Sequence, residues 1–387
     1  MLMSKIKLLL FSVVGALFAM SCESENSSFT PTIELSHNSI DAWYDAETYI
    51  IDVYANCEWR ATCDSDWVTI HKGANATGDA IIKFHVAKND SAEPRTAKIE
   101  VEAVGYTDIF ETLTISQSVL SEDYFKITYT STNNRVVEPY LANAFDAEIV
   151  SNTYNNGVGT ILFKTPVTKI AEEAFCDCST LKSISLPNSI TEIGGWAFFC
   201  CVGLQEVTLS NRLKTIGDAA LSSCGMLLSV TLPESLVNVG DSAFYGCSGM
   251  EAYYGKFASE DNRCLVIGNV LRHFAPRGLD EYAIPDGIVV IAHDAFYESL
   301  RLQRVTIPKS VKSIEEYAFY YCESLKSVYC KCETPPSLGV SVFDNSDDGV
   351  DKPIGCKIYV PNASVDLYKA TENWSRYKSY IYPDEKY

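Results

Sequence analysis

Positive charge is scarce in this sequence. Its 387 residues include 31 Lys and Arg against 50 Asp and Glu, which gives a formal net charge of -19 at pH 7. No run of basic residues occurs after residue 21. Nucleic acids and anionic membrane surfaces bind proteins through clustered Lys and Arg, because these side chains displace counterions from phosphates. The composition therefore predicts no nucleic-acid partner and disfavours direct binding to a membrane surface.

Motifs for metal binding and catalysis are missing as well. There are five His, and the close cysteine pairs lack the Cys-x-x-Cys spacing of a zinc site. The sequence contains no Gly-x-Ser-x-Gly, no His-Glu-x-x-His and no phosphate-binding glycine loop. The segment Asp344–Gly349 begins like a calcium loop, but Gly355 stands where a bidentate Glu is needed, so we expect a solvated acidic loop. We expect no catalytic activity, no metal and no cofactor.

A hydrophobic run of 13 residues, Leu8–Met20, follows Lys5 and Lys7 near the N-terminus. This length suits a signal peptide and is short for a transmembrane helix, which needs about 20 apolar residues. We therefore expect residues 1–21 to be a signal peptide that is absent from the mature protein.

The end of this run resembles a bacterial lipobox, in which Ser21 precedes Cys22. The resemblance implies that Cys22 is acylated and becomes the first residue of the mature protein. Glu23 and Glu25 resemble the signal that brings some Gram-negative lipoproteins to the outer face. The expected localisation is the outer membrane, lipid-anchored and facing outward, with the lipid as the only membrane contact. Residues 22–31 would then form a polar tether.

Residues 32–119 alternate short apolar runs with turn residues, a pattern typical of an all-β sandwich. Turns are expected at Asn75–Gly78 and Asn89–Pro94. The predicted strands are Tyr49–Tyr54, Val68–Ile70, Ala80–Val86, Ala97–Val101 and Leu113–Ile115.

Several motifs in this segment resemble the BACON domain family. They are Cys57–Ala61, Asp66–Ile70, Asn89, Arg95–Ile99 and Thr114–Gln117. The resemblance implies an immunoglobulin-like fold, in a family that has been proposed to bind glycans or mucin. Trp59 and Trp67 either stack on a sugar face or fill the sandwich core. The domain is correspondingly either a glycan-binding module or a spacer.

The C-terminal two-thirds of the chain is built from repeats with a 23-residue period. Each copy has an apolar first residue, Ala at the eighth position, then Phe or Leu, then Cys or Ser, and then Leu or Met. The copies begin at Val167, Ile190, Leu213, Leu236, Ile288 and Val311. Leu181–Leu186 has the spacing of a leucine-rich repeat, in which Ile184 and Leu186 point inward from a short strand. Only stacked neighbours bury that apolar face, so the array needs several copies and distinct ends.

These columns resemble the BspA-like branch of leucine-rich repeats. The resemblance implies a surface protein that adheres to host matrix proteins or other cells, and the family brings no catalytic residue. It extends to a truncated first coil at Val158, Ile161 and Phe163, and to a closing cap at Ile358–Pro361, Tyr368 and Trp374. The predicted fold is mainly β, an immunoglobulin-like β-sandwich followed by a leucine-rich-repeat solenoid. Its predicted parts are residues 32–119 (sandwich), 120–166 (N-terminal cap and truncated coil), 167–338 (repeats) and 339–387 (C-terminal cap).

One unit breaks the period, because 52 residues separate Leu236 from Ile288. The extra unit of 29 residues, Ser259–Gly287, lacks the Ala-Phe-x-x-Cys segment. Its segments Cys264–Ile267 and Val270–Phe274 predict a hairpin with a two-residue turn. The unit is either a ligand site or ordinary variation of the repeat.

The 14 cysteines of an exported chain raise the question of disulfides. One repeat column contains Cys178, Cys201, Cys224, Cys247, Ser299 and Cys322. A position that accepts either Cys or Ser needs a small buried residue, so we expect reduced, packed thiols in this column. The disulfide state of Cys57, Cys63, Cys330 and Cys332 stays open.

The outward positions of the repeat strands are the candidate contact surface. Tyr and Arg at such positions are enriched at binding hot spots. The candidate strip consists of Glu206, Thr208, Tyr254, Arg304, Thr306 and Tyr329. The favoured hypothesis is a non-enzymatic surface lipoprotein that binds a host or bacterial surface protein through this strip. The alternative is a glycan- or mucin-binding accessory lipoprotein of a polysaccharide-utilisation system.

Overall fold

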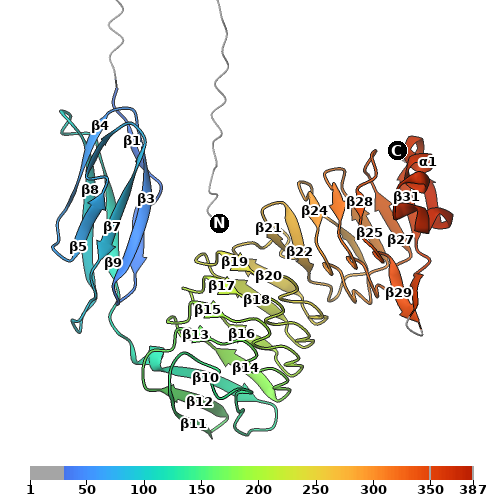
Figure 1. Ribbon diagram of the computed structural model, residues 1–387, viewed down its shortest axis with the longest axis horizontal. Coiled ribbons are helices and arrows are strands. Elements are labelled where there is room, and N and C mark those ends of the chain that lie inside the picture. The colour runs from blue at the N-terminus through green and yellow to red at the C-terminus, as the bar shows by residue number, and fades with distance from the viewer. Residues whose placement is uncertain (1–29, 348–349, 386–387) are drawn as a thin grey trace, which may run out of the picture. The chain divides into compact units, whose positions relative to one another are not determined.

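The computed structural model describes residues 30–347 and 350–385, and the chain divides into two compact units between Leu120 and Ser121 (Figure 1). Each unit has a hydrophobic core of its own, and the core of the second unit consists of two clusters. Within the described residues, no helix is long and apolar enough to cross a membrane. The predicted signal peptide, Cys22 and most of the predicted tether lie outside the described residues.

The first unit is a sandwich of two sheets, with strand orders β1-β3-β7-β5 and β2-β9-β8-β4-β6. Side chains alternate along each strand, so the inward residues of both sheets meet in one core. Trp59, Phe84 and Ile99 lie in this core without exposed surface. The strands are β1 (Ile33–Leu35), β2 (Ser39–Ala42), β3 (Glu47–Ala55), β4 (Glu58–Cys63), β5 (Val68–Lys72), β6 (Asn75–Thr77), β7 (Ala80–Val86), β8 (Arg95–Ala103) and β9 (Phe110–Gln117).

The five strands predicted for this unit all form, but β1, β2, β4 and β6 were not predicted. The turn predicted at Asn75–Gly78 is wrong, because β6 lies there and pairs with β4. A three-residue edge strand is too short to show a hydrophobic period. In β4 the signal is present, since exposed Glu58 and Arg60 alternate with buried Trp59 and Ala61.

An antiparallel cap opens the second unit. It comprises the 3-10 helix η1 (Glu122–Phe125) and strands β10 (Lys126–Ser131), β11 (Ile149–Asn155) and β12 (Val158–Phe163). Val158, Ile161 and Phe163, predicted as a truncated first coil, lie on β12. This strand runs in the same direction as the first repeat strand, β14, but β10 lies between them and is antiparallel to both. Ile161 and Phe163 are buried as in a coil. The apolar spacing reports that burial but does not reveal that β10 is inserted between β12 and β14.

Beyond the cap, the chain winds into coils that pair in parallel on two sides. Ile184 pairs with Val207 on the long-strand side, and Ile193 pairs with Ile216 on the short-strand side, one 23-residue period apart in each case. The long strands are β14 (Leu181–Ser185), β16 (Glu206–Thr208), β18 (Ser229–Leu232), β20 (Ala252–Gly255), β23 (Glu281–Ala283), β25 (Arg304–Ile307) and β27 (Ser327–Cys330). The short strands are β13 (Lys169–Ile170), β15 (Glu192–Ile193), β17 (Thr215–Ile216), β19 (Asn238–Val239), β24 (Val290–Ile291), β26 (Ser313–Ile314) and β28 (Ser337–Leu338). The predicted fold class, a mainly β chain with a sandwich and a solenoid, is confirmed.

The repeat columns form the solenoid core. The rings of Phe175 and Phe198 stack with centroids 5.4 Å apart. Column thiols donate hydrogen bonds to backbone carbonyls of the preceding coil, as Cys201 Sγ does to Phe175 O at 3.0 Å. Burial raises the pKa of Cys247 to about 12. The expected packed thiols are present, and Ser299, which replaces Cys in this column, is buried as well.

Every cysteine among the described residues is a free thiol in the structure. This set includes Cys57, Cys63, Cys330 and Cys332.

The irregular unit contains the predicted hairpin, formed by β21 (Cys264–Ile267) and β22 (Val270–Phe274). Phe274 takes the place of the missing Phe column, 4.6 Å from the ring of Phe296. The buried core is divided here into two clusters, with Leu265 in the first and Leu271 in the second. The hairpin therefore continues the stack of coils, and it is also the point at which the buried core divides.

The C-terminal cap comprises β29 (Asp344–Asp347), β30 (Val350–Pro353), β31 (Lys357–Pro361), η2 (Asn362–Ser364), α1 (Val365–Ala370), η3 (Trp374–Tyr380) and β32 (Ile381–Asp384). β31 and β32 extend the last long-strand sheet in parallel, and buried Trp374 closes the core. The solvated loop predicted to begin at Asp344 is wrong for that residue, which has no exposed surface. Its carboxylate lies 2.6 Å from Arg376 Nη2 and accepts the Tyr377 hydroxyl at 3.0 Å, so it fastens the cap.

Candidate binding surfaces

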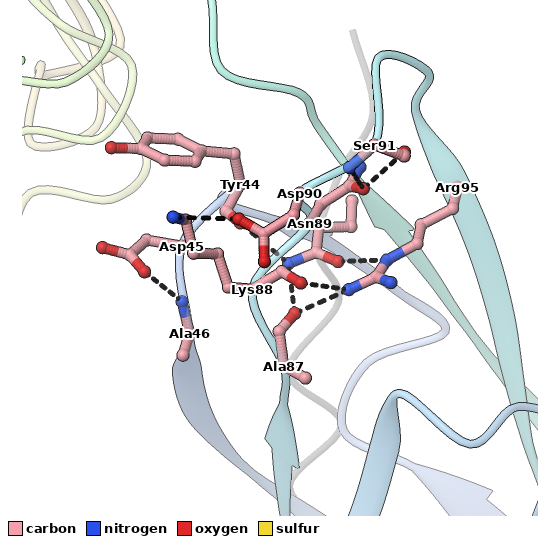
Figure 2. A network of polar contacts seen from close by, with 10 residues as sticks. Tyr44, Asp45, Ala46, Ala87, Lys88, Asn89, Asp90, Ser91 and Arg95 are labelled. Carbon is pink, nitrogen blue, oxygen red and sulfur yellow. Dashed lines mark hydrogen bonds and ion pairs between the residues drawn. The ribbon is translucent and has the colours of Figure 1, made fainter.

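In the sandwich, polar residues of the motifs that resemble the BACON domain form a network of hydrogen bonds (Figure 2). Arg95 Nε donates to Gln117 Oε1 at 2.7 Å, and Arg95 Nη2 donates to the Ala87 carbonyl at 2.7 Å. Asn89 Oδ1 accepts the Ser91 hydroxyl at 2.6 Å. Because these groups bind backbone and one another, they satisfy buried polar atoms and hold the strand ends together.

The two tryptophans of the sandwich differ in access. Trp59 is wrong as a candidate for sugar stacking, because its ring has no exposed surface and its Nε1 donates to the Gly78 carbonyl at 2.9 Å. Trp67 is half-buried, and the guanidinium of Arg95 lies 4.3 Å from its ring centroid. Trp67 also packs against the sandwich core, so Arg95 and the core together limit the ring surface that a sugar could contact.

The six residues of the candidate strip lie on three separate sheets. Glu206 and Thr208 are on β16 beside the N-terminal cap, Tyr254 is on β20, and Arg304, Thr306 and Tyr329 are on β25 and β27. All six point away from the core. Glu206, Thr208, Tyr254 and Arg304 are exposed, whereas Thr306 and Tyr329 are half-buried. The strip therefore divides into two surfaces, one around β16 and one around β25 and β27, and Tyr254 on β20 lies between them in sequence.

Around Thr208 the outward side chains carry hydroxyls. Thr160, Thr128, Ser185 and Thr208 are register partners in turn across β12, β10, β14 and β16. Neighbouring strands are about 4.8 Å apart, so these hydroxyls form a regular row. The repeat columns identify Ser185 and Thr208, whereas Thr128 and Thr160 lie on β10 and β12 of the cap.

Around Tyr329 the outward side chains are aromatic. Tyr329, Tyr359 and Tyr382 lie opposite one another on β27, β31 and β32. The first two rings have centroids 4.8 Å apart and planes 14° apart, and Tyr382 follows at 6.2 Å and 41°. We call these three residues the tyrosine ladder.

Cations flank the tyrosine ladder at both ends. The guanidinium carbon of Arg304 lies 5.8 Å from the ring centroid of Tyr329, and its Nη1 lies 2.9 Å from a carboxylate oxygen of Glu281. Lys357 Nζ lies 5.8 Å from the ring centroid of Tyr382. Aromatic rings beside Arg and Lys are the composition of binding hot spots.

Tyr359 and Tyr382 are outside the predicted strip, because the cap strands do not follow the repeat. Tyr359 comes 30 residues after Tyr329 in the sequence. The sequence does contain a local signal, since Tyr359 stands between the apolar residues Ile358 and Val360, the alternation of a strand with one buried face.

Two titratable side chains in the interior of the solenoid, His273 and Asp294, have strongly shifted pKa values. Burial lowers the pKa of His273 to about 3, and its Nδ1 lies 2.7 Å from the Tyr253 hydroxyl. Burial raises the pKa of Asp294 to about 6, against the opposing effect of His293, whose Nε2 lies 2.9 Å from the carboxylate. In the part of the chain that the structure describes, no group of three or more His, Cys, Asp and Glu is arranged to hold a metal ion.

Parallel coils with apolar columns inside and an open strand surface outside define a solenoid of the leucine-rich-repeat class, preceded here by an immunoglobulin-like sandwich. The family model of the BspA type leucine rich repeat region matches six copies in residues 148–258 and 272–349. The BACON family model matches residues 58–118. Both resemblances seen in the sequence are confirmed. The two domain types are those of binding and surface proteins.

Solved structures similar to this chain include a leucine rich cell surface protein from Faecalibacterium prausnitzii, at 18% identity, covering 58% of this chain and 89% of that one, with a TM-score of 0.32. The T. pallidum leucine rich repeat protein is 26% identical over 46% of this chain and 70% of its own, with a TM-score of 0.29. A Bacteroides ovatus GH5 xyloglucanase is 19% identical over 24% of this chain, with a TM-score of 0.22, and this chain spans 20% of its length. No curated protein matches the chain.

Proposed function

We propose that this chain is a non-enzymatic, lipid-anchored surface protein that binds a protein partner, from a host or another bacterium, through the tyrosine ladder. The lipid on Cys22 would hold it at the outer membrane, and the sandwich would serve as a spacer. The observation that carries the proposal is the ladder itself, three aligned tyrosines between Arg304 and Lys357 on an open sheet surface.

The stacking geometry of the ladder favours a protein over a sugar. Tyr329 and Tyr359 cover each other's ring faces, since their planes differ by 14° at 4.8 Å. They therefore present ring edges and hydroxyls to a partner. A pyranose stacks on an open ring face, whereas the amides and side chains of a protein bind hydroxyls and ring edges well.

The test replaces Tyr329 and Tyr359 together by Ala and measures the affinity for purified host matrix proteins and bacterial surface proteins by surface plasmon resonance. We expect at least a tenfold loss of affinity, which corresponds to about 1.4 kcal/mol. Thr231→Ala, at an exposed outward position of β18, is the matched control and should bind as wild type does.

Equal affinities of the double variant and the wild type, at an unchanged unfolding midpoint, would contradict the proposal. So would the failure of the wild-type protein to bind any member of either protein set.

A further inference from the structure

A groove at the N-terminal end of the solenoid has a different chemistry from the tyrosine ladder. It has a volume of about 450 Å³ and lies where the cap meets the first coils. Its walls include Tyr124, Thr128, Ser185, Asn188, Thr208 and Asn211. Ligand sites in proteins commonly measure about 300–1,000 Å³, so the groove has room for a small organic ligand.

The charged side chains of this groove neutralise each other. Lys126 Nζ lies 2.7 Å from Asp123 Oδ1. The other wall side chains that carry polar atoms are hydroxyls, carboxamides and one phenol. Such a wall exerts little net attraction on an ion, so the free energy of binding must come from hydrogen bonds and apolar contact.

The hydrogen-bonding groups of the groove are regularly placed. Thr128 is the register partner of Ser185, and Ser185 is the register partner of Thr208, which gives a hydroxyl about every 4.8 Å. Asn188 and Asn211 occupy the same place in successive coils, and the Asn211 backbone N–H donates to Asn188 Oδ1 at 2.9 Å, which orients that carboxamide. Hydroxyls and carboxamides both donate and accept. Their natural complement is a ligand with donor–acceptor hydroxyls recurring along its length.

From this arrangement we infer that the groove binds a neutral oligosaccharide, with Asn188, Asn211 and Thr208 hydrogen-bonding to sugar hydroxyls and Tyr124 contacting a sugar ring. This site lies on the solenoid and not at Trp59 or Trp67. It goes beyond the protein partner proposed above and does not depend on it, because none of its residues belongs to the tyrosine ladder.

The experiment titrates the detergent-solubilised full chain with cellohexaose, with desialylated mucin oligosaccharides and with sialylated mucin oligosaccharides, by isothermal titration calorimetry. We expect at least one neutral probe to bind, and sialylation to give no gain in affinity. The two neutral probes distinguish a plant from a host source of the same chemistry. The double variant Asn188→Ala with Asn211→Ala should lose at least tenfold in affinity, whereas the ladder variant Tyr329→Ala with Tyr359→Ala should bind sugar as wild type does.

The inference is overturned if no neutral probe binds at millimolar concentration, or if the double asparagine variant binds as tightly as wild type. Binding of sialylated probes alone also overturns it. If the asparagine variant unfolds, Thr208→Val gives the second measurement, because it removes one exposed hydroxyl at nearly constant volume. The proposed function is tested by the affinity of the ladder variant for protein partners, whereas this inference is tested by the affinity of the groove variants for sugars. Failure of one is therefore distinguishable from failure of the other.

Discussion

At the scale of single residues, Trp59 and Trp67 have different environments in one sandwich. Trp59 occupies an inward position of β4 and is fully buried, whereas Trp67 precedes β5 and stays half-buried beside Arg95. The sequence leaves both residues with the same two alternatives, core or sugar contact. The choice depends on which strand face the opposite sheet covers, and that is a tertiary property.

Replacing Trp59 by Ala should lower the free energy of unfolding of the sandwich by about 3–5 kcal/mol, because it leaves a large cavity between the sheets. Trp67→Ala is the matched comparison and should cost clearly less, since its ring is only partly enclosed. Urea denaturation followed by far-ultraviolet circular dichroism measures both. Equal losses for the two variants would show that the burial difference does not hold in solution.

Asp294 should make stability depend on pH. Its pKa is raised from 3.8 to about 6 by burial, with His293 opposing and Glu316 reinforcing the shift. A raised carboxyl pKa means that the folded state holds the proton more tightly. The contribution of this group to stability is therefore full below pH 3.8 and is lost as the pH rises through about 6.

Asp294→Asn removes this titration and suits the backbone, because Asn tolerates the positive φ of 58° at this position. We expect the variant to be more stable than wild type at about pH 7.5 by about 1–2 kcal/mol, after allowance for solvent screening, and to have no advantage at about pH 4. Urea unfolding at both pH values checks this. Asp286→Asn, at an exposed site, is the control; the same pH dependence in both variants would remove Asp294 as its source.

At the scale of elements, the hairpin β21–β22 decides how the two parts of the solenoid are joined. Phe274 contacts the rings of Tyr282 and Phe296 at 4.6 Å each, within the second core cluster. Each coil of a repeat array is stabilised mainly by its contacts with the adjacent coils, so a defect in one coil destabilises those neighbours first.

Phe274→Ala should therefore increase amide hydrogen exchange in β22 and β24 while β14 and β16 keep their protection. The local cost should be about 3–5 kcal/mol. Phe198→Ala, in the first core cluster, is the counterpart and should expose β14 and β16 instead. Hydrogen exchange read by mass spectrometry resolves the two patterns. A uniform loss of protection in both variants would mean that the solenoid unfolds as a single unit.

At the scale of the whole molecule, the chain is two units with separate cores, and the proposed anchor precedes both. The proposed function needs Cys22 to carry a lipid. A single acyl chain gives only reversible membrane binding, whereas several acyl chains on one protein bind the membrane far more strongly.

Cys22→Ser should move the protein from the membrane fraction to the soluble fraction and abolish incorporation of radiolabelled palmitate. Cys57→Ser is the control and should leave both unchanged, because this thiol lies within the folded sandwich. Fractionation with immunoblotting provides the measurement. Retention of the Cys22 variant in the membrane would refute lipid anchoring at this residue.

The sequence by itself determined the core of this protein and the period of its solenoid. The Ala, Phe, Cys and Leu columns recur every 23 residues because each coil packs on its immediate neighbours, so a local pattern is enough to define the fold. The hairpin of the irregular unit followed from local turn chemistry for the same reason.

Only the tertiary structure decided the surfaces. The insertion of β10 between Val158–Phe163 and the first repeat strand placed these residues in the cap, and the non-periodic cap strands added Tyr359 and Tyr382 to Tyr329. The hydroxyl groove likewise joins cap residues to repeat residues. Each of these surfaces depends on segments that meet without sharing a period, and hydrophobic spacing records which residues are buried but not which exposed residues become neighbours.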